Sequence, residues 1–227
     1  SIDLPNVACL MFAQNQASYL VGLVAGMMTE SNTIGYVQGM VSDAMNQFGV
    51  GYIAGVLEAC PEASVLQYNA NNFGDIAGGA TAAKDMITKG ADVIYHAAGG
   101  TGNGVMNACD EEGIWGIGVD CDQAVVLGLD CIITSAMKQL QNVTETVLEA
   151  LNTGAWETYG GKITNFSLAE GEYVGLPTAE ASWRLDTYTV EEYNTLKEAI
   201  IDGTVTISAD TESEPTVADT TTVNYIG

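Results

Sequence analysis

The chain has 227 residues, and its 29 acidic side chains against 6 basic ones give a formal net charge of −23. Such a charge repels phosphate backbones and anionic lipid headgroups, so it excludes nucleic-acid binding as a function. A hydrophobic content of 47% is enough for the core of one large or two small domains. The longest apolar stretches fall short of the run of about 20 residues that a membrane-spanning helix needs.

The first half of the chain alternates strand and helix patterns. The opening "SIDLPNVACLMF" predicts a loop that enters a strand, and apolar residues at helical spacing then predict a helix over about 17–28. Within it, Gly22 and Gly26 indicate close approach of the helix to a strand. Helical patterning separates the next predicted strands, at 33–39, 64–70, 91–97 and 114–120. Repeated βαβ order favours a mostly parallel sheet.

The regular alternation of strand and helix patterns ends after residue 120. A turn leads to a short strand, "CIITS" (131–135), and a long helix extends to about Asn152. Glycines mark a connection up to about Ile163, and short strands and one helix (190–200) follow. The acidic, threonine-rich segment 208–222 is typical of a solvated, partly mobile end.

Closely spaced glycines follow the predicted strand 91–97. Gly100, Gly102 and Gly104 begin a dinucleotide-type pattern, but Val105 stands where the third glycine of G-x-G-x-x-G belongs. No lysine follows as a P-loop requires, so triphosphate hydrolysis is excluded. What remains is a turn that lets a ligand approach backbone N–H groups at a helix N-terminus, on the carboxyl edge of a parallel sheet.

Three side chains are candidates for the same edge. Phe73 follows a strand directly, and its ring is interpreted either as core packing or as a stacking platform for a planar ligand. Asp120 ends the next strand but one, where a carboxylate can accept hydrogen bonds from ligand hydroxyls. Lys138 is expected to open the helix after "IITS", as a surface lysine or a ligand contact.

Other reactive residues favour structural roles. His96 lies within a strand pattern without a metal or triad partner, so a hydrogen-bonded structural histidine is expected. Ser135 and Lys138 match S-x-x-K, but the accompanying K-T-G is absent. The cysteines lack zinc or redox spacing and are expected to be small buried apolar residues: Cys9, Cys60, Cys109, Cys121 and Cys131. No catalytic residue, metal or cofactor is predicted.

Several phrases together carry a family resemblance: "NVACLMFAQNQASYLVGLVAGMMT", "IGYVQGM", "NNFGDIAGG", "GADVIYHAAGGTGNGV", "GIGVDCDQ" and "ITSAMK". In content and order they resemble the basic membrane protein family of bacterial substrate-binding lipoproteins, which are similar to purine nucleoside receptor A. The resemblance implies an α/β type I periplasmic-binding-protein fold with two Rossmann-like, parallel-sheet lobes.

The resemblance also divides the chain. Residues 1–10 would end the first lobe and its hinge, and 11–121 would form the second lobe. Residues 122–160 would return to the first lobe, and 161–227 would cross back and end in the acidic tail. The family's opening segment has no counterpart before Ser1. Most of the first lobe is therefore expected to be absent from this chain.

By resemblance, the pocket residues take definite roles. Phe73 would stack on a purine, Gly100 and Gly102 would line the pocket through their backbone, and Asp120 and Lys138 would make polar contacts that include the ribose. The implied function is extracytoplasmic binding of a purine nucleoside for an ABC transporter permease, with no reaction and with a lipid anchor on an N-terminal segment. The alternatives are a ligand-sensing protein of the same fold and a doubly wound enzyme acting on nucleosides.

Overall fold

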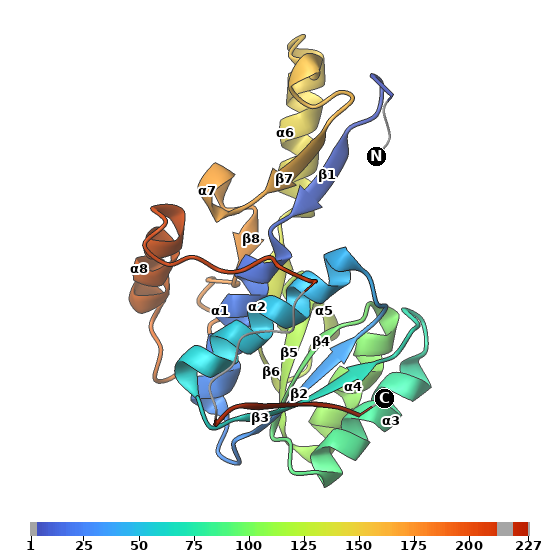
Figure 1. The fold of residues 1–227 in the computed structure, drawn as a ribbon, viewed down its shortest axis with the longest axis vertical. Coiled ribbons are helices and arrows are strands. Elements are labelled where there is room, and N and C mark those ends of the chain that lie inside the picture. The colour runs from blue at the N-terminus through green and yellow to red at the C-terminus, as the bar shows by residue number, and fades with distance from the viewer. Residues whose placement is uncertain (1–3, 213–219, 227) are drawn as a thin grey trace.

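The computed structural model describes residues 4–212 and 220–226. Figure 1 shows a wide body around a large sheet, and a narrower part that rises from it and contains β1, β7 and α6. We call these the large unit and the small unit. The strands are β1 (Cys9–Phe12), β2 (Thr33–Gln38), β3 (Ser64–Asn69), β4 (Val93–Ala97), β5 (Trp115–Asp120), β6 (Ile132–Lys138), β7 (Ile163–Phe166), β8 (Val174–Gly175) and β9 (Thr222–Tyr225). The helices are α1 (Gln14–Met28), α2 (Asp43–Ala59), α3 (Ile76–Thr88), α4 (Gly100–Glu112), α5 (Gln123–Leu127), α6 (Leu140–Asn152), the 3-10 turn η1 (Trp156–Thr158), α7 (Leu168–Gly171) and α8 (Val190–Ile201).

The large unit is built on a seven-stranded sheet in the order β8-β6-β5-β4-β2-β3-β9. All neighbours pair in parallel except β8, which runs antiparallel to β6. The four strands predicted between residues 33 and 120 are confirmed as β2 to β5. Their near-continuous apolar content follows from burial on both faces, because helices cover both sides of a parallel sheet.

Alternate residues along these strands enter two cores. Tyr36 and Tyr95 point to the face covered by α1 and α2, where their rings stack at 5.3 Å between centroids. Val37 and Ile94 point to the opposite face and pack with residues of α3 and α4. All four side chains are fully buried or nearly so. Because successive side chains of a strand point to opposite faces, the strand sequence determines which residues pack against each of the two helical layers.

Helices α1 and α2 pack backbone to backbone through glycines. A Cβ added to Gly22 would lie 2.2 Å from the carbonyl oxygen of Tyr52, and one on Gly51 would lie 2.1 Å from that of Asn15. Gly26 faces α2 as well, at Ala59. The prediction that Gly22 and Gly26 approach a strand was wrong: the close partner is helix α2, whose own glycines complete the contact.

Strand β6 continues the large sheet beyond β5. Strand β6 pairs with β5 as far as Met137, so the chain leaves the large sheet only after Lys138. Lys138 therefore ends a strand and does not open a helix, which corrects its predicted position. The run of residues 132–136 is fully buried, and this burial extends the strand beyond the expected "CIITS".

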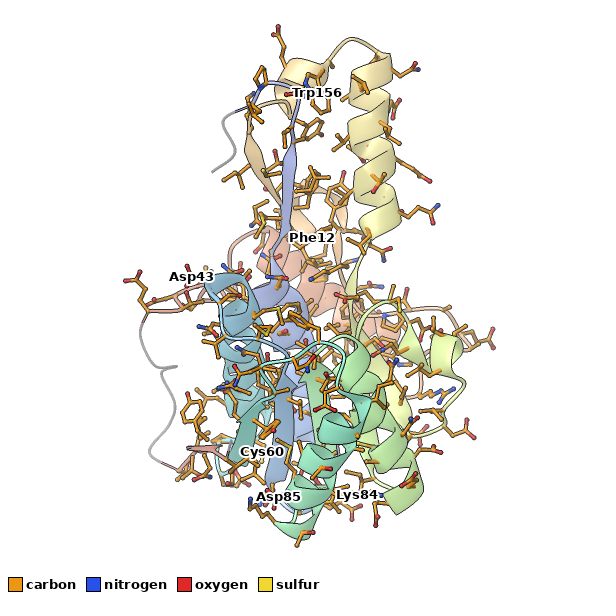
Figure 2. The ribbon with its side chains drawn as sticks, turned by 90° about the vertical axis from the view of Figure 1, so that its right-hand side faces the viewer. Phe12, Asp43, Cys60, Lys84, Asp85 and Trp156 are labelled. Atoms are coloured by element: carbon orange, nitrogen blue, oxygen red, sulfur yellow. The ribbon has the colours of Figure 1, made fainter. Side chains whose placement is uncertain are left out.

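The small unit consists of the parallel pair β1–β7, with α6 packed beside it. The predicted entry strand is confirmed as β1, which lies wholly in the small unit through its pairing with β7. Val143 and Val147 are the buried residues of α6. Figure 2 shows Phe12 where the small unit meets the large one and Trp156 near the far end of the small unit.

The C-terminal end adds an edge strand. Part of the segment predicted to be solvated and mobile, 213–219, lies outside the described residues. From Thr222, the last residue of that segment, the chain forms β9, which pairs in parallel with β3. None of the helices in the described ranges is long and apolar enough to cross a membrane.

Replacing Gly51 by alanine should destabilise the protein by about 1–3 kcal/mol, because the new methyl group meets a backbone carbonyl of α1 that cannot move independently. Gly74→Ala is the matched control, since the nearest atom to its added Cβ is 3.7 Å away. Urea unfolding of both variants checks this. Gly51→Ala with the midpoint of the parent protein would contradict the proposed helix contact.

Candidate ligand-binding site

A cavity of about 420 Å³ lies at the carboxyl edge of the large sheet, where β4, β5 and β6 end. Its lining residues come from α2, the β3–α3 loop, the start of α4 and the ends of those strands: Met45, Phe48, Phe73, Ala97, Gly99, Gly100, Val119, Asp120 and Lys138. Four of the five residues singled out in the sequence are in this set. The structure thus brings together Phe73, Gly100, Asp120 and Lys138.

Phe73 lies in the loop between β3 and α3, with its side chain 46% exposed. Its ring rests on the backbone of Gly39, where an added Cβ would lie 2.3 Å from ring atom Cε1. Gly99 lies against the same residue on the α4 side. A large apolar ring at the rim of a cavity fits the stacking interpretation better than core packing.

Thr101 fixes this loop to the start of α4. Its backbone N–H donates to the Phe73 carbonyl at 3.1 Å, and its hydroxyl donates to the Asn72 carbonyl at 2.8 Å. The hydroxyl also accepts from the Asp75 N–H at 2.9 Å. Asp75 caps α3 by accepting from the Gly78 N–H. The sequence analysis missed Thr101, although a hydroxyl residue inside a glycine-rich turn is a usable signal.

The glycines of the turn before and within α4 differ in whether they lie at the cavity. Gly99 precedes α4 with φ of 55°, a backbone conformation that favours glycine, and Gly100 opens the helix at the cavity. Gly102 is buried and does not line the cavity. A Cβ there would lie 1.9 Å from Nδ1 of His96, so Gly102 makes room for that ring. The structure therefore gives Gly102 a packing contact, and it does not bring this glycine together with the cavity residues.

His96 is fully buried and held in one tautomer. Its Nε2 lies 2.8 Å from Oε1 of Gln123, an oxygen that also accepts from the Val119 N–H. A carbonyl oxygen only accepts, so Nε2 carries the proton, and Nδ1 accepts from the Ala98 N–H. Burial lowers the pKa of His96 from 6.5 to about 4, against the opposing effect of the Gln123 hydrogen bond. The expected structural histidine is confirmed.

Asp120 and Lys138 form the polar side of the cavity. Oδ1 of Asp120 lies 3.3 Å from Nζ of Lys138, and the carboxylate side chain is 47% exposed while that of the lysine is 17% exposed. Asp120 adopts φ of 67°, which turns the chain sharply at the end of β5. The two charges cancel, so the cavity carries no net charge from these side chains although the protein is strongly acidic.

Ser135 takes no part in the cavity. It is fully buried on β6, and its hydroxyl oxygen accepts from the Gln123 N–H at 3.1 Å. Because positions 135 and 138 belong to a strand, they point to opposite faces of the sheet. The S-x-x-K match therefore has no helical turn on which a nucleophile and its base could meet.

Helix α2 supplies two cavity residues that the sequence analysis missed, Met45 and Phe48. The helix begins after Ser42, whose hydroxyl accepts from the Met45 N–H. Figure 2 shows Asp43, the first residue of α2, on the side of the large unit nearest Phe12, and Cys60 toward the opposite end. The serine cap after the 33–39 strand was the available signal, because it places the first turns of the helix at the carboxyl edge.

A second cavity, of about 260 Å³, lies on the other side of α2. Amide side chains from β2, α2 and β3 line it, together with residues of the C-terminal segment: Gln38, Asn46, Gln67 and Asn69 are the amides. Gln38 already donates to the Met40 carbonyl and to Asn46. The lining of this second cavity contains none of the residues predicted for the site.

The five cysteines form no disulfide. Cys60, Cys109 and Cys131 are buried, as expected of small apolar residues, and burial raises the pKa of Cys131 to about 12. Cys9 is partly exposed and Cys121 is exposed, which differs from that expectation. Across the described ranges, no group of three or more His, Cys, Asp or Glu side chains is arranged to hold a metal ion.

Residues 2–211 match the family model Bmp, described as ABC transporter substrate-binding protein PnrA-like. Over 221 residues the chain is 34% identical to a CD4+ T-cell-stimulating antigen of Listeria innocua, covering 90% of this chain and 60% of that protein. It is 33% identical over 223 residues to the ABC transporter nucleoside-binding protein BmpA of Lactococcus lactis, covering 90% and 61%. The family resemblance drawn from the sequence is confirmed, and the chain spans about 60% of the length of these relatives.

The fold is similar to that of an ABC transporter solute-binding protein from Aeropyrum pernix K1. The two structures superpose with a TM-score of 0.73 at 23% identity, over 88% of this chain and 66% of the other. This similarity confirms the predicted fold class, the α/β type I periplasmic-binding-protein fold. The seven-stranded large unit and the small unit built on β1–β7 together make up the part of that fold present in the described residues.

The depressed pKa of His96 should make stability depend on pH. The unfolded chain binds a proton at this residue near pH 6.5 but the folded chain only near pH 4, so the free energy of unfolding should fall by up to about 3 kcal/mol between those values. Above pH 6.5 this contribution is fully present. His96→Gln removes it, because the chain has only 1 histidine. Urea unfolding at pH 7.5 and 4.5 should show a larger loss in the parent protein, and equal losses would contradict the assignment.

Proposed function

Because the chain belongs to the family of PnrA-like ABC transporter substrate-binding proteins, we propose that it binds a purine nucleoside or a similar small ligand outside the cytoplasm and delivers it to a permease. Attachment to the membrane through a lipid anchor is part of this proposal. One relative, the Lactococcus protein, is named as nucleoside-binding, which supports the choice of ligand.

The observation that carries the proposal is the convergence of three kinds of contact on one cavity. Phe73 offers an exposed ring to a planar base, and Asp120 offers acceptors to hydroxyl groups. Lys138 offers N–H donors to ring or sugar oxygens. The N–H of Gly100, at the start of α4, adds a backbone donor. A nucleoside has a flat base joined to a polyol, so it matches this combination.

The same geometry supports binding without a reaction. His96 is sealed behind Gly102 and bonded to Gln123, so it does not reach the cavity as a base. Ser135 is buried and its hydroxyl oxygen already accepts a hydrogen bond. The cavity residues themselves offer a carboxylate and an ammonium in contact with each other, an arrangement that orients a ligand but provides no nucleophile with its base.

Phe73→Ala should weaken binding of guanosine or adenosine to the natural protein by about 1–3 kcal/mol, the range of base–aromatic stacking. Ile76→Ala is the control, because Ile76 is also exposed at the start of α3 but does not line the cavity. Titration calorimetry measures both. Unchanged affinity in a folded Phe73→Ala variant would place the base elsewhere.

Asp120→Asn should weaken binding of a ribonucleoside more than that of its 2′,3′-dideoxy analogue, since each hydrogen bond to a charged acceptor contributes about 1.5–3 kcal/mol. Asparagine tolerates the left-handed backbone at this position, so the loop should keep its shape. Asp130→Asn, a highly exposed carboxylate outside the cavity, controls for the change of net charge. Equal losses for both ligands would contradict a hydroxyl contact.

Nucleoside monophosphates should bind more weakly than the nucleosides. Among the described residues that line the cavity, Lys138 is the only cation and is already paired with Asp120, and the net charge of −23 opposes an added phosphate. Calorimetry with guanosine and guanosine monophosphate in the same buffer provides the comparison. Tighter binding of the monophosphate would show that the start of α4 serves as a phosphate site.

A further inference from the structure

The ammonium group of Lys138 is held by aromatic rings as well as by a carboxylate. Its Nζ lies 4.7 Å from the centroid of the Phe48 ring and 6.0 Å from that of Phe12. The first distance is well inside the range of a cation–π contact, and the second lies at its limit. In the described part of the chain, the ammonium thus contacts side chains from α2, β1 and β5.

The ion pair alone restrains this lysine weakly. The Asp120 side chain is 47% exposed, and its oxygen lies 3.3 Å from Nζ, so solvent screens the attraction. The lysine side chain is only 17% exposed, so most of its surface contacts protein and not water. An ammonium removed from water needs compensating contacts, and the face of an aromatic ring supplies one without using a hydrogen-bond acceptor.

The Phe48 ring is suited to this task because it is packed in the core. Its side chain is 1% exposed and belongs to the core formed by α1, α2 and the sheet. It reaches that position because Gly51, one turn further along α2, packs on the backbone of Asn15. A ring packed in a core defines the position of the ammonium more strictly than a half-exposed carboxylate does.

We propose that Phe48 is a positioning residue for ligand recognition: its ring holds the ammonium of Lys138 so that N–H donors not used by Asp120 face the cavity. Phe12 makes a weaker version of the same contact from β1. This inference rests on the proposed function only in assigning a neutral ligand to the cavity. The contact between Lys138 and Phe48 is independent of the ligand.

The test replaces Phe48 by mono-, di- and trifluorophenylalanine, which keeps the ring shape while progressively weakening its attraction for a cation. The first readout needs no ligand: the rate at which Lys138 is reductively methylated, followed by mass spectrometry. We expect a rise of about two- to fivefold across the series, the change that corresponds to a contact of about 0.5–1 kcal/mol. A ring that only filled space would give no trend.

Phe166 provides the matched control. It is also buried, at 3% exposure, and it packs on Phe12 at 6.2 Å between centroids, but no contact joins it to Lys138 in the described part of the chain. Its fluorinated series should leave the methylation rate unchanged. The series at Phe12 should give a smaller rise than the series at Phe48, in line with its longer distance.

The second readout is nucleoside affinity by calorimetry. It should fall by about two- to fivefold across the Phe48 series, and the trend should vanish in a Lys138→Met background. A methylation rate that does not depend on fluorination would overturn the positioning role. A methylation trend without any nucleoside binding by the parent protein would uphold the contact and contradict the proposed function instead, so the two failures are distinguishable.

Discussion

The backbone contact between α1 and α2 is the constraint on which the site depends. Gly22 meets the carbonyl of Tyr52 and Gly51 meets that of Asn15, at separations that admit no side chain. Helices that pack this closely have few alternative registers, so the contact sets both the rotation and the height of α2 over the sheet. The start of α2 then brings Phe48 to the carboxyl edge, beside the end of β6.

A cavity without net charge in a chain of −23 is a selective environment. Each uncompensated carboxylate near a ligand would favour cations, and a free ammonium would favour phosphates. Pairing Asp120 with Lys138 at 3.3 Å removes both preferences while leaving donors and acceptors in place. Recognition then depends on hydrogen-bond geometry and ring stacking, which distinguish neutral polar ligands better than the overall field of the protein does.

The sequence predicted the features that follow from local pattern. Strand periodicity placed β2 to β5, and the rule that parallel strands end at one edge placed Phe73, Gly100 and Asp120 together. Prediction from the sequence failed where the role of a residue depends on a contact with a residue far away along the chain. Gly102 has the spacing of a pocket glycine, but His96, brought behind it by β4, uses the space.

The misplacement of Lys138 has the same kind of cause. "IITSAMK" continues directly into a helical pattern, so the sequence alone does not show where the strand stops. Pairing with β5 as far as Met137, and with β8 at Lys138, extends the strand to that residue. Phe48 was missed because a phenylalanine at helical spacing is normally a core residue, and here it is one. Its contact with Lys138 depends on tertiary packing.

Phe73 shows how a binding residue can be exposed and yet fixed. An aromatic side chain with 46% exposure loses part of the free energy that burial would provide, and a mobile one would also lose entropy on binding. Here the Thr101 N–H holds the Phe73 carbonyl, and the backbones of Gly39 and Gly99 support the ring. The ring is thus ordered before any ligand arrives, so a stacked base gains contact area without a further ordering cost. The glycines at 39 and 99 therefore contribute to binding through Phe73, although Gly39 does not itself line the cavity.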